Sequence, residues 1–217
     1  MSVERISIAL DGPAGAGKST IAKMIASIKN LLYIDTGAMY RAITLKIIKT
    51  GIPVEDYDAI TELLNNTVIE MTESDVILDG EIVTFDIRHP NVSNLVSSIA
   101  KIPSVREKMV ELQRQMANHH NVIMDGRDIG TNVLPNATHK FFLTASLDER
   151  ARRRYDELVE KGHSIDLEDV RVEMALRDKI DSEREINPLR KAVDAIIIDT
   201  TSKTINEVIL NILSYTN

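Results

Sequence analysis

Short apolar runs recur along the chain, and amphipathic helical stretches lie between them. The runs are rich in Ile and Val and are bounded by Asp, Gly, Thr or Ser: Ile6–Leu10, Leu31–Ile34, Asn121–Met124, His139–Leu143 and Ala195–Ile198. Nearly continuous apolar runs are typical of strands buried on both faces, as in a parallel sheet covered by helices. The pattern therefore predicts an α/β fold with about five parallel strands, whose ligands bind beyond the carboxyl ends of the strands.

One region breaks this alternation of strands and helices. Residues 68–86 carry two β-type runs joined by Asp79-Gly80, which is a strong signal for a two-residue hairpin. Together with Val68–Thr72 they predict a small antiparallel meander. A helical stretch follows the meander and runs to about Asn118.

The length of 217 residues suffices for one sizeable α/β domain with a smaller insert. We expect residues 1–65 and 111–217 to form the core and residues 66–110 to form an insert beside the main sheet. The alternative for the meander is a surface hairpin without a functional role.

Charge and composition narrow the possible functions. The net charge of −7 argues against a general nucleic-acid binder, although local basic clusters could still bind small phosphates. The absence of cysteine excludes disulfides, thiolate metal sites and a cysteine nucleophile. No apolar run is long enough for a signal peptide or a membrane span. We therefore expect a soluble, cytoplasmic, monomeric protein without a nucleic-acid or membrane partner.

The stretch LDGPAGAGKST, residues 10–20, fits the pattern G-x-x-x-x-G-K-[ST] directly after an expected strand and at the start of an expected helix. Glycines let the backbone wrap closely and point its N–H groups at phosphate oxygens. Lys18 can reach the β- and γ-phosphates, and the Ser19 hydroxyl can ligate Mg²⁺. We expect this loop to bind ATP with Mg²⁺ through Gly12, Pro13, Ala14, Gly15, Ala16, Gly17, Lys18, Ser19 and Thr20.

Other motifs distinguish among the classes of protein that carry such a loop. The N-K-x-D motif of GTP switch proteins and the L-S-G-G-Q signature of transporter ATPases are both absent from the sequence. A motor or helicase would be larger and would show further nucleotide-sensing motifs. A small P-loop kinase needs instead a second phosphate site built from arginines, and the sequence offers four basic clusters.

Two of these clusters follow expected strands. In DTGAMYR, residues 35–41, Thr36 is the expected N-cap of a helix and Arg41 lies little more than one turn further on. In DGRDIG, residues 125–130, Asp125 is well placed to orient Mg²⁺ through water, with Arg127 and Asp128 on the same turn. For the first cluster, a helix cap followed by a solvated arginine is the alternative.

The other two clusters lie on expected helices. Arg150, Arg153 and Arg154 share one helical face and could close over the transferring phosphoryl group as a lid, unless they belong to a solvated face. Spacings of four and three also put Arg177, Asp181 and Arg184 on one helical face. Such a face could bind an anion and a sugar hydroxyl, with an intrahelical salt-bridge ladder as the alternative.

The chain resembles the bacterial cytidylate kinases, a family of nucleoside monophosphate kinases. The resemblance rests on LDGPAGAGKST, DTGAMYRA at 35–42, DGRDIGT at 125–131 and LRDKIDSER at 176–184, which occur in this order over essentially the whole chain. The P-loop alone is not specific, whereas DTGAMYR followed by DGRDIGT is. The resemblance implies a five-stranded parallel core, an insert of a small antiparallel sheet plus a helix, and a short lid at about 148–165.

The resemblance also implies roles for individual residues. The acceptor phosphate would contact Arg41, Arg127 and Arg184, with Thr36 nearby. The cytosine would contact Ser97, Arg106 and Asp128. The ribose would contact Arg177 and Asp181, and the lid would contain Arg150, Arg153 and Arg154. Where some relatives have Ser at position 36 this chain has Thr, which retains the hydroxyl.

The expected reaction is transfer of the ATP γ-phosphoryl group to CMP or dCMP. Catalysis then consists of alignment and charge neutralisation by Lys18, Arg41, Arg127, Arg184 and the lid arginines. The alternatives are another small P-loop kinase, such as a uridylate, adenylate or shikimate kinase, and a regulatory ATP-binding protein without transfer activity.

Overall fold

The computed structural model describes residues 5–72, 74–118 and 120–216 of the chain. The chain forms two compact units. Unit 1 combines Met1–Tyr33 with Asn121–Asn217, and unit 2 is the intervening segment Ile34–His120. Unit 2 is wider than the expected insert of residues 66–110, because helical segments that precede the insert pack against its elements. The binding role expected for residues 66–110 stays a prediction.

The main sheet has five strands in the order β2-β6-β1-β7-β8. Their bounds are Ser7–Asp11 for β1, Leu32–Asp35 for β2, Val122–Gly126 for β6, His139–Thr144 for β7 and Ile196–Asp199 for β8. β1 pairs in parallel with β6 and β7, and β7 with β8, which confirms the predicted parallel sheet. Leu10 lies opposite both Asp125 and Phe141, so the loops that follow β1, β6 and β7 leave the sheet at one edge.

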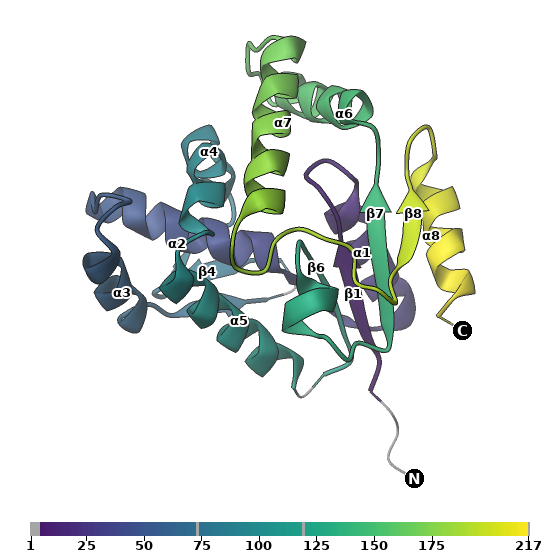
Figure 1. The fold of residues 1–217 in the computed structure, drawn as a ribbon, viewed down its shortest axis with the longest axis horizontal. Coiled ribbons are helices and arrows are strands. Elements are labelled where there is room, and N and C mark those ends of the chain that lie inside the picture. Colours follow the sequence, from purple (N-terminus) through teal and green to yellow (C-terminus); the bar gives the residue numbers. More distant parts are fainter. Residues whose placement is uncertain (1–4, 73, 119, 217) are drawn as a thin grey trace. The chain divides into compact units, whose positions relative to one another are not determined.

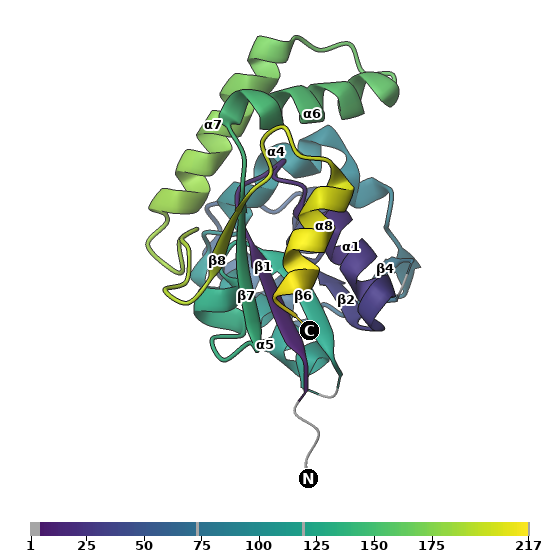
Figure 2. The same ribbon diagram turned by 90° about the vertical axis from the view of Figure 1, so that its right-hand side faces the viewer.

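Among the residues of unit 1 that the structure describes, the longer helices are α1 (Lys18–Lys29), α6 (Leu147–Glu160), α7 (Leu167–Glu183) and α8 (Ile205–Ser214). The side chains of α1 and α8 form one apolar cluster with strand residues such as Ile8 and Leu10, so these two helices cover one face of the sheet (Figure 2). α6 begins directly after β7 and packs against α7 (Figure 1). Their contact is built around Ala151, Leu158, Val170 and Met174.

The described part of unit 2 contains four helices and the predicted meander. Its helices are α2 (Thr36–Thr50), α3 (Tyr57–Asn65), α4 (Pro90–Ile99) and α5 (Pro103–Ala117), with a short 3₁₀ turn η1 at Asp86–Arg88. The strands β3 (Ile69–Met71), β4 (Val76–Leu78) and β5 (Glu81–Ile82) pair antiparallel in sequence order. This arrangement confirms the predicted meander.

The turn residues and prolines explain the local structure of unit 2. Asp79 and Gly80 both have positive φ, 51° and 87°, as the tight turn between β4 and β5 requires. The helical stretch expected to run to about Asn118 is two helices, because Pro103 starts a new helix after α4 ends. Among the described residues, no helix combines the length and apolar character needed to cross a membrane.

Candidate active site

The P-loop follows β1 and leads into α1, as predicted. Gly12 and Gly15 have positive φ, 146° and 74°, and a Cβ on Gly12 would lie 2.0 Å from the Leu143 carbonyl oxygen. Gly17 precedes α1 in a left-handed conformation and provides no side-chain cap. The first N–H groups of α1 are therefore not capped by the residue before the helix, and they suit an anion at this end of the helix.

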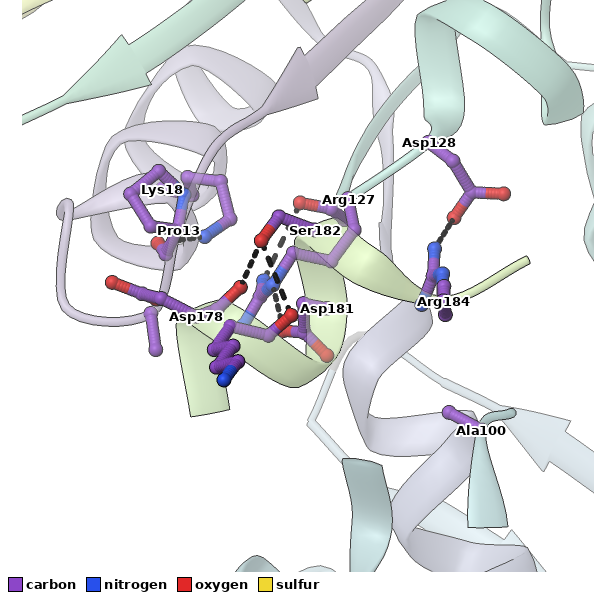
Figure 3. A network of polar contacts seen from close by, with 12 residues as sticks. Pro13, Lys18, Ala100, Arg127, Asp128, Asp178, Asp181, Ser182 and Arg184 are labelled. Carbon is purple, nitrogen blue, oxygen red and sulfur yellow. Dashed lines mark hydrogen bonds and ion pairs between the residues drawn. The ribbon is translucent and has the colours of Figure 1, made fainter. Parts of the chain in front are cut away.

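Lys18 is buried at the start of α1. Its ammonium group donates a hydrogen bond to the Pro13 carbonyl oxygen, 2.7 Å away, so it lies over the loop (Figure 3). Burial and the neighbouring charge of Arg127 hold the pKa of Lys18 well below its usual value. An anionic phosphate beside this ammonium group would favour its charged form.

Asp125 is held by two hydroxyl groups at the carboxyl end of β6. Ser19 donates to its Oδ2 at 2.8 Å and Tyr33 donates to its Oδ1 at 2.9 Å, and the carboxylate is 4% exposed. Hydroxyl and carboxylate oxygens are the hard ligands that Mg²⁺ prefers, so Ser19 and Asp125 fit a magnesium ion. The sequence did not reveal Tyr33, since a tyrosine near the end of an apolar strand is typical of a side chain that only packs in the core.

Arg127 and Asp181 form a partly buried ion pair that joins the turn after β6 to α7. Arg127 donates through Nε to Asp181 Oδ2 at 2.8 Å (Figure 3). Burial raises the pKa of Asp181, but the guanidinium groups of Arg127 and Arg177 outweigh it and hold that pKa below its usual value. The pair holds the Arg127 guanidinium group through Nε, and Nη1 donates to the Gly126 carbonyl oxygen at 3.4 Å.

Asp128 and Arg184 form a second ion pair, which is buried. Arg184 donates through Nη2 to Asp128 Oδ1 at 2.9 Å and through Nε to the Asn187 carbonyl oxygen at 2.7 Å. The prediction that Arg184 shares a helical face with Arg177 and Asp181 is wrong, because α7 ends at Glu183 and Arg184 is extended. It turns toward Asp128, whereas Asp181 faces Arg127 (Figure 3).

The three arginines of the expected lid have different partners. Arg150 is buried and donates to the Ala14 carbonyl oxygen of the P-loop at 3.1 Å, and it also pairs with Asp178. Arg153 bonds to Glu149 and Thr200, and Arg154 bonds to Glu157. Of the three, Arg150 has a hydrogen bond to the P-loop itself. A lid role for the group stays a prediction.

Asp35 organises a basic cluster at the start of α2 in unit 2. Its carboxylate accepts the Ala38 N–H at 2.8 Å, so Asp35 is the N-cap of α2. The prediction that Thr36 is the cap is wrong, because the strand already ends in a capping aspartate and Thr36 is the first helical residue. Arg41 and Arg88 lie 4.0 Å and 3.8 Å from the Asp35 carboxylate.

Arg88 was missed by sequence reasoning. It lies in η1, 47 residues after Arg41, and no spacing in the sequence relates the two arginines. Both side chains approach the same carboxylate, so unit 2 brings two guanidinium groups together at the amino end of α2. Such a pair of planar donors suits a phosphate group.

Arg106 and Ser97 are both buried within unit 2. Arg106 is 2% exposed, donates to the Ala100 carbonyl oxygen at 3.2 Å, and lies over the Tyr40 ring with 5.7 Å between the guanidinium carbon and the ring centre. Ser97 is 7% exposed on α4. A buried guanidinium is costly unless its donors are used. The base-binding role expected for Arg106 and Ser97 stays a prediction.

Comparison with known proteins identifies the family. A family model described as cytidylate kinase matches residues 8–217. The chain belongs to the cytidylate kinase family. Among curated cytidylate kinases, that of Geobacillus thermodenitrificans is 54% identical over 217 residues, which cover 98% of this chain and 97% of the relative. The cytidylate kinase of Clostridioides difficile is 51% identical over 210 residues, which cover 97% of each chain.

Solved structures support the fold of this cytidylate kinase family member. Shikimate kinase from Acinetobacter baumannii has a TM-score of 0.51 and 15% identity, covering 98% of this chain and 93% of that one. An uncharacterised protein from Eubacterium ventriosum has a TM-score of 0.55 and 15% identity, covering 98% of each chain. At this identity the likeness concerns the fold alone, which is that of the small P-loop kinases.

Proposed function

We propose that this kinase transfers the γ-phosphoryl group of ATP to CMP or dCMP in the presence of Mg²⁺. The proposal is supported above all by the loop of residues 12–20 at the end of β1, set beside Asp125 and Arg127 at the end of β6. This edge of the sheet therefore carries cationic groups beside a carboxylate that would help to bind a metal ion. Membership of the cytidylate kinase family supports the choice of acceptor.

The donor half of the reaction belongs to unit 1. The N–H groups at the start of α1 and the Lys18 ammonium group would hold the ATP phosphates. Ser19 and Asp125 would hold Mg²⁺, which when bound neutralises charge on the phosphate oxygens. The lid arginines Arg150, Arg153 and Arg154 would add positive charge and exclude water, since an open site would hydrolyse ATP.

The acceptor half needs no base or covalent intermediate. A monophosphate oxygen is already nucleophilic, so the protein has only to align it and neutralise the charge that develops. In this proposal the phosphate binds Arg41, Arg127 and Arg184, with Thr36 nearby. Arg88 joins this set because it approaches the same carboxylate as Arg41.

Cytosine would be selected by its hydrogen-bonding edge. Asp128 would accept a hydrogen bond from its amino group, and Arg106 and Ser97 would donate hydrogen bonds to its N3 and O2. Uracil reverses the pattern at positions 3 and 4 and would leave buried groups unpaired, which costs several kcal/mol. Arg177 and Asp181 would bind the ribose hydroxyls.

An acceptor panel tests the proposal. ADP release from ATP and Mg²⁺ is measured with CMP, dCMP, UMP, AMP and shikimate as acceptors. We expect strong turnover with CMP and dCMP and weak turnover with the others. Lys18→Ala should abolish the turnover with CMP and dCMP, whereas Lys203→Ala, at an exposed position, should leave it unchanged. Tight ATP binding without acceptor-dependent ADP release, or a preference for UMP or AMP, would contradict the proposal.

A further inference from the structure

Asp11 is a buried carboxylate to which the reaction described above assigns no role. It is the last residue of β1, directly before the P-loop, and it is 3% exposed. Its Oδ1 accepts the N–H of Ile129 and its Oδ2 accepts the N–H of Gly130, each at 2.8 Å. Both donors belong to the segment that follows Arg127 and Asp128.

The two N–H groups open a short helical turn, η2 (Ile129–Val133), whose own cap residue does not cap it. Asp128 precedes this turn, and an aspartate at that position ordinarily accepts an N–H of the following turn with its side chain. Here Asp128 makes no such bond. Its Oδ1 accepts from Arg184 and its Oδ2 accepts from the Asn132 side chain at 3.1 Å. Asp11 therefore caps η2 from another strand.

Burying a carboxylate at position 11 costs free energy, which its two backbone hydrogen bonds have to offset. Burial raises the pKa of Asp11 to about 6, and the two N–H bonds and the charge of Lys18 only partly offset this effect, while the Asp128 carboxylate adds to it. A neutral side chain would avoid the burial cost. It could not, however, accept two backbone N–H bonds on two separate oxygens.

Close packing fixes the turn against Asp11. A Cβ on Gly130 would lie 3.3 Å from Asp11 Oδ2 and 3.2 Å from the Lys140 side chain, so glycine permits the close approach of this backbone. Asp11 also lies opposite Gly126 in the β1–β6 register. The segment from Gly126 to Gly130, which carries Arg127 and Asp128, is thus held at both ends by the last residue of β1.

We propose that Asp11 is a positioning residue for the acceptor nucleotide: it caps the turn after Asp128 and thereby fixes the backbone segment that carries Arg127 and Asp128. This inference rests on the proposed function, in which Asp128 and Arg127 bind CMP. It links the start of the donor loop to the acceptor-binding turn through two hydrogen bonds.

Asp11→Asn tests the proposal because it keeps the size of the side chain and replaces one acceptor oxygen by an N–H donor that faces a backbone N–H. Dissociation constants for CMP, UMP and ATP are measured by calorimetry. We expect CMP to bind about 10- to 100-fold more weakly, the preference of CMP over UMP to narrow, and ATP affinity to stay within about twofold of wild type. Asp56→Asn is the matched control, since Asp56 caps α3 through a single backbone bond, which asparagine also accepts.

Two results with a folded Asp11→Asn protein would overturn the proposal. One is an unchanged CMP affinity and an unchanged preference over UMP. The other is an equal loss of ATP and CMP affinity together with a lower melting temperature, which would make Asp11 a structural residue only.

A second measurement uses wild-type protein and serves if Asp11→Asn does not fold. Amide hydrogen exchange at Ile129 and Gly130 should be slow, and exchange as fast as that of exposed amides would overturn the capping bonds. This measurement does not depend on the reaction. A wild-type protein that binds no CMP but protects these two amides would therefore contradict the proposed function and leave the cap supported.

Discussion

Arg150 of α6 donates to Asp178 of α7, with 2.7 Å between Nη1 and Oδ2, and the same guanidinium group donates to the Ala14 carbonyl oxygen of the P-loop. One buried arginine thus ties together two helices and the phosphate-binding loop. A lid function of Arg150 would therefore have to operate while the side chain keeps these contacts. Its two neighbours, Arg153 and Arg154, lack a hydrogen bond to the loop among the contacts of the described residues.

Removing Arg150 should destabilise the protein as well as weaken ATP binding. Arg150→Ala leaves Asp178 without its cation, and we expect the free energy of unfolding to fall by about 3 kcal/mol, as for other buried ion pairs that lose one partner. The half-exposed pair of Arg154 with Glu157 contributes less than about 1 kcal/mol. Arg154→Ala is therefore the matched control in urea denaturation. An equal loss of unfolding free energy in the two variants would show that the contacts of Arg150 do not stabilise the protein more than those of Arg154.

Tyr33 should act on magnesium rather than on the acceptor. Tyr33→Phe removes the hydroxyl group that holds Asp125 Oδ1, and we expect affinity for the metal to fall about tenfold with little change in CMP affinity. The readout is binding of Mn²⁺ to the ATP-loaded protein, followed by electron paramagnetic resonance. Tyr57→Phe, at an exposed tyrosine, is the control. Unchanged Mn²⁺ affinity in Tyr33→Phe would show that Asp125 needs no such support.

Arg184 should be required for turnover. Losing one electrostatic contact to developing charge costs on the order of 10²–10³ in rate, so Arg184→Ala should lower kcat by about that factor. Circular dichroism checks the fold, because Asp128 also loses its ion pair with Arg184 in this variant. The exposed Arg190→Ala should keep wild-type kcat. Near-normal turnover of folded Arg184→Ala would mean that Arg184 does not hold the acceptor phosphate.

Lys46 should anchor the meander of unit 2. Its ammonium group bonds to Asp79 in the β4–β5 turn at 2.6 Å, and also to the Asn66 carbonyl oxygen and the Thr67 hydroxyl group. Lys46→Met should lower the free energy of unfolding by about 2 kcal/mol, since several hydrogen bonds are lost. Lys49→Met is matched to it, because Lys49 pairs with Glu81 of the same hairpin at 3.8 Å and both partners are exposed. That control should change stability by less than about 0.5 kcal/mol.

Asp11 should give the stability of the protein a characteristic pH dependence. Its pKa is about 6 in the folded protein against an ordinary value of 3.8, so between these values the folded protein binds more protons at this site than the unfolded chain. The contribution of Asp11 to stability is therefore fully present below about pH 4 and is lost as pH rises through 6, a change of about 3 kcal/mol.

Urea denaturation from pH 4 to pH 8, compared between wild type and Asp11→Asn, measures this contribution. Carboxylates such as Asp181, whose pKa is lowered, give the opposite slope but are common to both proteins and cancel in the difference. The free energy of unfolding of wild type minus that of Asp11→Asn should fall as pH rises from about 4 to about 6 and then stay constant. A difference that is constant with pH would mean that Asp11 titrates normally.

Much of the fold was determined by local sequence. The five apolar runs became the five strands. The central strands β1 and β6 are buried almost throughout, as continuous apolar runs predict, whereas Ile197 of the edge strand β8 is 59% exposed. Asp79-Gly80 became the hairpin turn, because both residues must adopt positive φ. The P-loop was equally readable, since its glycines, Lys18 and Ser19 act within a few residues of one another. The order of the motifs sufficed to indicate the kinase family.

Only the tertiary structure decided which distant residues meet. Asp11 and Ile129 are 118 positions apart, and Tyr33 and Asp125 are 92 apart. The first pair meets because β6 is placed beside β1 in the sheet, an order that no local period of the sequence encodes. For the same reason the helical spacing of Arg150, Arg153 and Arg154 predicted a shared face but not three different sets of partners. Spacing along a chain records secondary structure, whereas the pairing of charges depends on how the elements pack.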